Sequence, residues 1–447
     1  MADLVSFTDM ILVPFYLFVI FGVAVRIKSR NIQNFPEYEY FLRGLYFKVF
    51  GVSMFMFVYL FYYQGGDTIN YFLGSRAISE LIIKDFSVGI EILLNPLNDI
   101  SGWKKFIAYG ISPPPYYMWK DPSTFFVSIL TAPLSLLGFR SFLVSSLLTT
   151  CLSYVGIWKL YRLFNIIYPG NSRAFAYLIL FLPSLIFWGG GIMKDSFVLG
   201  ATCWITYNFY QIFIARKKIF MNITFFIINL LIIINIKAYI IISLFPGMAL
   251  WLNSAYLKAI RNPLIKFLVF PIIILGISGI GFMSFSSMSS MMGAYGDVDT
   301  AIEKAQVIQE DLLRTDQYGK NNYDLGTLDG SLIGLIRVAP TAILTAIFRP
   351  LPWEIGSPTM ILSALENITL IVFTLYILLR CSPFTVFKII FKDPFLVYCF
   401  IFSITFAFGV GIAGTNFGAL VRYKIPLIPF FFSMIYMVYK RSKIKNS

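Results

Sequence analysis

Apolar runs long enough to cross a lipid bilayer recur along this sequence and constrain its fold more than any other feature. They lie near residues 9–25, 47–63, 141–158, 174–190, 196–215, 219–236, 238–256, 265–283, 357–379, 395–413 and 425–439. Hydrophobic residues make up 58% of the chain and charged residues only 13%, which is more apolar surface than a soluble globule can bury. Because a spanning helix needs roughly 17 residues or more, the runs predict an all-α polytopic membrane protein of about 11 transmembrane helices. We expect residues 1–447 to form a single integral membrane domain.

The charged loops between these runs indicate the direction in which the chain crosses the membrane. Two further apolar stretches, 123–138 and 332–348, are interrupted by proline or a charge, and whether they cross is open. If both are helices along the outer interface, the inner loops hold most of the Lys and Arg, as the positive-inside rule requires. We therefore expect the N-terminus outside and the C-terminus inside, with the first run a retained span. Two outer loops follow: 64–140 with amphipathic and interfacial helices, and 284–356 with an acidic helix starting near Asp299.

Composition excludes several kinds of chemistry. The chain has no histidine, which removes the commonest general base and metal ligand, so acid–base chemistry must come from carboxylates, Lys or Tyr. The four cysteines lack metal-type spacing and are expected to be small buried hydrophobic residues. We assign the net charge of +14 to cytoplasmic loop anchors rather than to nucleic-acid binding. No cofactor is certain, and a role for a divalent metal is open.

The stretch YYQGGDTINYF, residues 62–72, places a carboxylate on a glycine turn directly after an apolar run. Asp67 follows two glycines and precedes an amphipathic stretch, 68–83, which is predicted to be helical. As a structural residue, Asp67 would open that helix. As a functional residue, it would be a general base exposed at the edge of the bilayer. Position alone leaves both interpretations open.

Four further segments on the expected outer side carry residues that we assign to binding the substrate, the basic ones to its phosphate. They are GGGIMKDS with Lys194 and Asp195, INIKAYIII with Lys237, FRPLPWE with Arg349, Trp353 and Glu354, and LVRYKIP with Arg422, Tyr423 and Lys424. Each has a structural alternative: solvated hairpin charges, a snorkelling lysine, an Arg–Glu pair beside an interfacial Trp, and contact with anionic lipid. Charges near the membrane interior are costly and usually functional, so their gathering on one side favours a site. Glu366 lies inside a predicted span and should pair with a cation on a neighbouring helix.

The order of these features resembles a known family. A span, an Asp on an outer turn, an amphipathic helix and a proline-rich segment are followed by SLLGFRSFLVSSLLTTCLSYVGIWKLYRLF and FLPSLIFWGGGIMKDSFVLG. This order is similar to the GT-C superfamily of polytopic glycosyltransferases, which includes protein mannosyltransferases and the lipid A aminoarabinose transferase. PSLIFWGGGIMKDSF, FRPLPWE and RYKIP look more narrowly like uncharacterised bacterial membrane proteins found with surface-polysaccharide genes. The resemblance runs in order through residue 215, with scattered motifs beyond.

The resemblance implies a GT-C-like fold and a role for individual residues. It implies that Asp67 is the catalytic base of an inverting displacement, that a polyprenyl-phosphate-linked sugar is the donor, and that basic outer residues hold its phosphate. Three features depart from the family pattern: the extra run at 9–25, Thr68 in place of a second acidic residue after Asp67, and no large soluble C-terminal domain. The last two leave the acceptor and the sugar open.

The sequence therefore predicts a membrane glycosyltransferase of the cell envelope, acting in polysaccharide biosynthesis. Its active site would face outward from the bacterial cytoplasmic membrane, and a glycan, lipid or protein would accept the sugar. One alternative is an O-antigen or capsule polymerase, for which 284–356 would be the large outer loop. Others are a lipid-linked sugar flippase or transporter, and a structural subunit. A transporter would place polar groups near the middle of the membrane, whereas the charges here gather at one face, which favours the transferase.

Overall fold

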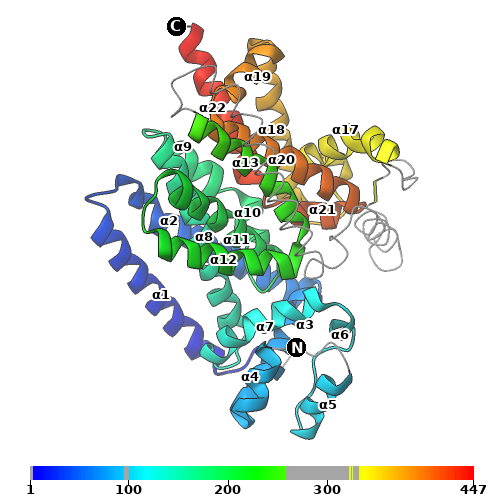
Figure 1. Cartoon of the computed structure of the whole chain (residues 1–447). Coiled ribbons are helices and arrows are strands. Elements are labelled where there is room, and N and C mark those ends of the chain that lie inside the picture. The colour runs from blue at the N-terminus through cyan, green and yellow to red at the C-terminus, as the bar shows by residue number, and fades with distance from the viewer. Residues whose placement is uncertain (1–3, 95–99, 258–321, 324, 326–331, 447) are drawn as a thin grey trace. The chain divides into compact units, whose positions relative to one another are not determined.

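The computed structural model describes residues 4–94, 100–257, 322–323, 325 and 332–446 (Figure 1). Within these ranges every regular element is a helix, which confirms the predicted all-α class. The chain forms two compact units. Unit 1 comprises Met1–Tyr207 and Leu231–Lys237, and unit 2 comprises Asn208–Leu230 and Ala238–Ser447.

Eight helices in the described part of the chain are long and apolar enough to cross a membrane. They are α1 (Asp9–Asn31), the Pro36–Tyr62 helix made of η1 (Pro36–Tyr38), α2 (Glu39–Phe57) and η2 (Val58–Tyr62), α8 (Phe142–Ile167), α11 (Lys194–Phe209) continued by η4 (Tyr210–Ile214), α12 (Ile219–Lys237), α13 (Tyr239–Leu257), α18 (Met360–Arg380) and α20 (Pro394–Ala413). A ninth arises if α21 (Phe417–Tyr423) and α22 (Ile428–Asn446), bent by 71°, count as one span. The chain is therefore a polytopic, membrane-embedded helical protein.

The remaining predicted spans differ from this set. The 174–190 run is divided into α9 (Ser172–Phe175), η3 (Ala176–Leu180) and α10 (Pro183–Trp188), because the proline at 183 cannot continue the preceding helix. The 425–439 run lies in the second half of the bent pair. The 265–283 run and the acidic helix near Asp299 lie outside the described residues. The two ambiguous stretches form α7 (Pro122–Leu137) and α17 (Leu332–Phe348), whose 16 and 17 residues make them shorter than the spanning helices.

Several helices begin with a polar cap followed by proline. Asp121 precedes α7, Ser382 precedes α19 (Pro383–Phe391) and Asp393 precedes α20, and each side chain accepts a hydrogen bond from a backbone N–H of the first turn. The cap satisfies an N–H that has no partner within the helix, and proline at the next position lacks an N–H to satisfy. Local sequence therefore fixes where these helices start, including the position of Asp121.

In unit 1, α3 (Asp67–Lys84) packs on α7 and on α4 (Phe86–Leu94), and α2 packs on α8 and α10. The shorter α5 (Ile100–Ala108) and α6 (Tyr117–Lys120) complete the loop between α4 and α7. Different segments meet at the two ends of α8: Ser141 beside its start contacts Asp9, and Arg162 near its last turn lies 3.4 Å from Glu37. Glycines permit close helix packing, since a Cβ on Gly156 would lie 2.1 Å from the carbonyl oxygen of Gly200.

In unit 2, α20 is the central helix. It packs on α13, α17, α19 and α22. Rings along α20 stack on one another and on α13, with Trp251 against Phe395 and Tyr398, and Tyr398 against Phe402. The loop between α17 and α18 contains the short η6 (Pro352–Glu354). This loop and the end of α21 (Phe417–Tyr423) carry the polar residues that the sequence singles out in unit 2.

Candidate functional site

The turn before Asp67 depends on one of its two glycines. The Pro36–Tyr62 helix ends in a π-helical turn, and α3 starts at Asp67 after Gly66, which has φ 104° and ψ −176°. That backbone region is essentially restricted to glycine, and a Cβ on Gly66 would also lie 3.1 Å from the Tyr59 ring. Asp67 is exposed in the first turn of α3, where a negative charge is favoured by the helix dipole. The cap position itself is Gly66, so Asp67 is the first residue of the helix and not its cap.

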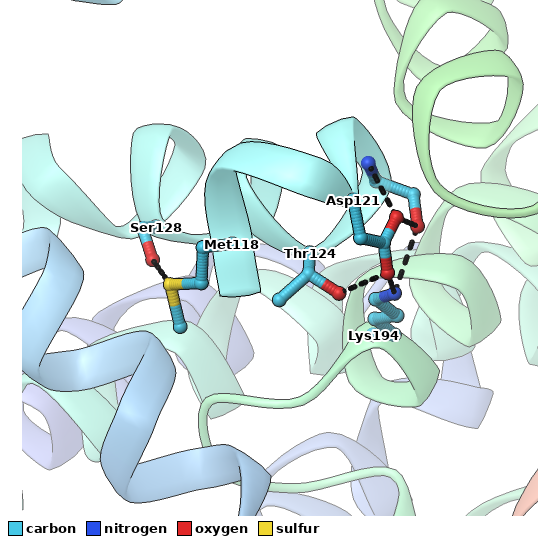
Figure 2. A network of polar contacts seen from close by, with 6 residues as sticks. Met118, Asp121, Thr124, Ser128 and Lys194 are labelled. Atoms are coloured by element: carbon cyan, nitrogen blue, oxygen red, sulfur yellow. Dashed lines mark hydrogen bonds and ion pairs between the residues drawn. The ribbon is translucent and has the colours of Figure 1, made fainter. Parts of the chain in front are cut away.

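A second carboxylate, Asp121, lies at the start of α7 and binds Lys194 of α11. The Lys194 ammonium is 3.2 Å from the Asp121 carboxylate and donates to the Ser123 hydroxyl at 2.8 Å. Asp121 also accepts hydrogen bonds from the Ser123 and Thr124 hydroxyls. Figure 2 shows the contacts of Asp121 with Thr124 and Lys194. Burial alone would raise the pKa of the Asp121 carboxyl, but the Lys194 ammonium and these hydroxyls outweigh burial, so this pKa lies well below its usual value. Asp121 is therefore a carboxylate at neutral pH.

Tyr117 of α6 lies within electrostatic reach of both carboxylates. Burial raises the pKa of its phenol, a hydrogen bond from Asn70 of α3 opposes the rise, and the charges of Asp67 and Asp121 raise it further. The Lys194 ammonium likewise lies within electrostatic reach of both Asp121 and Asp67. One ammonium, one phenol and two carboxylates from α3, α6, α7 and α11 therefore form a single cluster in unit 1.

Next to Lys194, Asp195 forms a buried ion pair with Lys237. The carboxylate and the ammonium are 2.6 Å apart, and their side chains are 5% and 10% exposed. Asp195 is in the first turn of α11 and Lys237 is the last residue of α12, so each charge also complements a helix dipole. The structure thus brings together the predicted residues Asp67, Lys194, Asp195 and Lys237. Lys237 contacts a carboxylate instead of extending toward solvent.

The remaining predicted site residues belong to unit 2. Arg349 forms a forked ion pair with Glu354, in which its Nε lies 2.9 and 3.2 Å from the two carboxylate oxygens. The same guanidinium lies 4.8 Å from the centre of the Phe417 ring. Trp353 is 79% exposed on η6, and the adjacent Arg–Glu pair holds the loop that presents it. The Arg–Glu pair expected as a structural alternative therefore exists in the structure.

Lys424 is buried in unit 2. Its ammonium donates to the Arg349 carbonyl and to the Asn367 side-chain oxygen, both at 2.8 Å. Glu366 of α18 lies within electrostatic reach of this ammonium, as expected for a buried carboxylate. At the end of α21, the Arg422 guanidinium lies 5.9 Å from the centre of the Tyr423 ring.

Sequence reasoning missed Asp121, Tyr117 and Asn70. The motif WKDPST, with an Asp before Pro at a helix start, was a local signal for Asp121 as a cap. Its pairing with Lys194 joins residues 73 positions apart, for which a single sequence holds no signal. Within the described residues, no group of three or more Cys, Asp or Glu side chains lies close enough to hold a metal ion.

The unit 1 cluster has the groups needed for one kind of chemistry. An exposed carboxylate can accept a proton from a hydroxyl, and a nearby ammonium can stabilise an oxyanion that forms in the same step. No protein-family model, curated protein or solved structure matches this chain.

Proposed function

We propose that the chain is a membrane glycosyltransferase that moves a sugar from a polyprenyl-phosphate-linked donor to a hydroxyl-bearing acceptor. The observation that carries the proposal is the exposed Asp67 carboxylate at a glycine turn, in one cluster with the Lys194 ammonium. A lipid-borne donor reaches such a cluster along the membrane, and an acceptor reaches it from the aqueous side. In the proposed topology, that side is the outer face of a bacterial cytoplasmic membrane.

In the proposed reaction, Asp67 is the general base. It takes the proton of the acceptor hydroxyl while the oxygen attacks the anomeric carbon from the face opposite the phosphate. The new carbon–oxygen bond forms as the bond to the phosphate oxygen breaks, which inverts the anomeric centre. The leaving polyprenyl phosphate carries the negative charge away, and Lys194 stabilises that charge as it develops.

Asp121 and the Asp195–Lys237 pair prepare Lys194 for this role. Asp121 holds the ammonium by an ion pair and is itself fixed as the cap of α7. Asp195 and Lys237 neutralise one another beside it, so the pair adds no net charge to the site. The ammonium is then paired with Asp121 and lies within electrostatic reach of a second carboxylate, Asp67. The cluster therefore attracts a phosphate only through Lys194, which makes Lys194 the group to test.

The test uses the purified protein in lipid nanodiscs with a radiolabelled polyprenyl-phosphate sugar and a membrane extract as the source of acceptor. Asp67→Asn should lower turnover by about 100-fold or more while donor binding is kept, because only the base is lost. Lys194→Met should weaken donor binding about tenfold, the contribution of one charge-assisted hydrogen bond. Glu91→Gln is the matched control, since Glu91 is another exposed carboxylate of the same loop, 2.7 Å from Lys105. Transfer that survives Asp67→Asn would exclude the proposed base.

A second candidate, a transporter of lipid-linked sugars, is favoured by a different observation. Lys48 is 2% exposed within the candidate span Pro36–Tyr62, and it contacts α10, part of a helix broken at Pro183. Buried charges and broken helices are typical of transport sites. Proteoliposomes with a fluorescent lipid-linked sugar distinguish the two functions. Movement between leaflets without transfer would favour the transporter, and transfer without movement would favour the enzyme.

A further inference from the structure

The turn that carries Lys194 is contacted by a buried lysine that the proposed mechanism does not use. Lys48 of α2 donates a hydrogen bond from its ammonium to the backbone carbonyl of Leu185 on α10. Within the described residues, it forms no ion pair with a carboxylate. Burying an ammonium in a spanning helix is costly, and a cation at the last carbonyls of a helix recovers part of that cost. The contact therefore points to a role at the end of α10.

The end of α10 leads into a non-helical segment, Gly189–Met193, that side chains hold at several points. A Cβ on Gly189 would lie 2.7 Å from the Lys48 Nζ, so this glycine lies directly against the ammonium. The Gly190 carbonyl accepts a hydrogen bond from the Ser196 hydroxyl at 2.7 Å, and the Gly191 N–H donates to the Thr150 hydroxyl at 2.9 Å. Side chains thus satisfy backbone groups that water would satisfy in an exposed loop.

Glycine is required along this segment because the segment packs so closely against α2 that a Cβ would collide with it. Gly191 has φ 72°, and a Cβ there would lie 2.5 Å from the Phe55 ring. A Cβ on Gly190 would lie 3.2 Å from the Val52 side chain. The GGG motif is therefore a site of close packing, and α2 supplies both its packing surface and the Lys48 ammonium.

The position of this segment sets the start of α11. Met193 is followed at once by Lys194 and Asp195, which make the ion pairs to Asp121 and Lys237. A shift of the segment would move the two charged groups together, because both belong to the first turn of one helix. Lys48 can therefore act on Lys194 without touching it.

We propose that Lys48 is a positioning residue for Lys194. Its ammonium fixes the end of α10 and the Gly189–Met193 segment, so that α11 starts where Lys194 meets Asp121 and, in catalysis, the phosphate of the lipid-linked donor. Only this last step, the contact with phosphate, rests on the proposed function. The contacts by which Lys48 positions the start of α11 do not depend on that function.

Hydrogen–deuterium exchange of the protein in nanodiscs tests whether Lys48 and Thr150 hold the Gly189–Met193 segment in place, an arrangement that we call the clamp. In Lys48→Met, amides 190–197 should exchange about tenfold faster or more, because the carbonyl loses a charged donor. Lys48→Arg keeps a donor and should stay near the wild type. Lys159→Met is the matched control, since this lysine of another spanning helix lies 4.9 Å from the centre of the Tyr207 ring. Unchanged exchange at 190–197 in Lys48→Met would overturn the proposal.

Thr150→Val provides a second variant if Lys48→Met does not fold. It removes the hydroxyl that accepts from Gly191 and nearly preserves side-chain volume. Faster exchange confined to 190–197 is expected again. Exchange equal to that of the wild type would show that the segment is not held by these contacts, and would overturn the clamp.

Binding of undecaprenyl phosphate to the same samples separates this inference from the proposed function. Lys48→Met should bind it about fivefold more weakly and Lys48→Arg should recover most of the affinity, as expected for an indirect loss of one charged contact. A loosened segment with unchanged affinity would overturn the positioning role. If the wild type does not bind this lipid but Lys48→Met still loosens the segment, the proposed function fails and the clamp stands.

Discussion

Gly66 adopts φ 104° and ψ −176°, and this turn determines where α3 starts and therefore where the Asp67 carboxylate lies. Alanine cannot adopt this conformation without strain, so Gly66→Ala should cost about 1–3 kcal/mol of stability. Gly65→Ala is the matched control, because a Cβ there would meet nothing closer than a carbonyl oxygen at 4.0 Å. Thermal melting in one detergent should show a lower Tm for Gly66→Ala alone. Equal Tm values for the two variants would mean that the turn does not depend on Gly66.

Asp121 combines two roles that substitutions can separate. Asn is as good a helix cap as Asp, so Asp121→Asn removes the charge and keeps the cap, whereas Asp121→Ala removes both and should cost about 1 kcal/mol more. With the competing charge gone, the Lys194 ammonium should bind a polyprenyl phosphate more tightly in Asp121→Asn than in the wild type. Calorimetry of phosphate-lipid binding checks this order, and weaker binding in Asp121→Asn would contradict it.

The pH dependence of this contact follows from the lowered pKa of Asp121. A carboxyl whose pKa is lower in the folded state than in the unfolded state stabilises the fold above the unfolded pKa. That stabilisation is lost as the pH falls through the folded value. The Tm difference between wild type and Asp121→Asn should therefore be constant from pH 7 down to about pH 4 and shrink below it. A difference that already disappears near pH 6 would show that Asp121 is not paired with Lys194.

At the scale of elements, the Asp195–Lys237 pair joins the start of α11 to the end of α12. Removing one partner leaves a buried charge without its counter-ion, so Lys237→Met should cost about 3–5 kcal/mol. Asp195→Asn combined with Lys237→Met should recover part of this loss, because neither charge remains. A double-mutant cycle of melting temperatures measures the coupling. Additive losses would mean that the two helices are not joined through this pair.

Some helix boundaries were readable from the sequence, whereas others, such as the start of the Pro36–Tyr62 helix, and the contacts between helices were not. The predicted amphipathic helix 68–83 is α3, which extends by one residue at each end. The proline at 183 signalled the break before α10, but the surrounding apolar run is long enough to span a membrane and was therefore predicted as one helix. The contacts of Lys194 with Asp121 and of Lys48 with Leu185 depend on how helices pack, which a periodic pattern does not encode. Lys48 was overlooked because one lysine does little to the mean hydropathy of its run.

At the scale of the whole molecule, charges sort to particular ends within each unit. In unit 1, Arg162 and Glu37 meet at the end of α8 opposite to the one beside Asp9. In unit 2, Arg441 pairs with Asp393 before α20, while the Lys424 network lies after α20. These groupings agree with loops that alternate between two sides of a membrane. Each grouping lies within a single unit, so the topology can be tested in each unit separately.

Cysteine labelling with a membrane-impermeant maleimide tests the proposed sidedness in a variant whose four native cysteines are replaced. Lys104 and Arg173 are exposed reporters for unit 1, and Gly356 and Lys217 are exposed reporters for unit 2. The positive-inside rule predicts that cysteines at 104 and 356 react in intact cells. Cysteines at 173 and 217 should react only after the membrane is opened.

The choice of reporters matters for this experiment. Ser135 of α7 is fully buried, so the absence of labelling there would carry no information about sidedness, whereas each of the four chosen residues is exposed. The reverse result, in which Arg173→Cys reacts in intact cells and Lys104→Cys reacts only after the membrane is opened, would place Asp67 and Lys194 on the cytoplasmic side. The donor would then have to present its sugar to the cytoplasm, and an outward-facing glycosyltransferase would be excluded. Because α7 and α8 both lie between these positions, labelling of both from one side would mean either that α8 does not cross the membrane or that α7 crosses it as well.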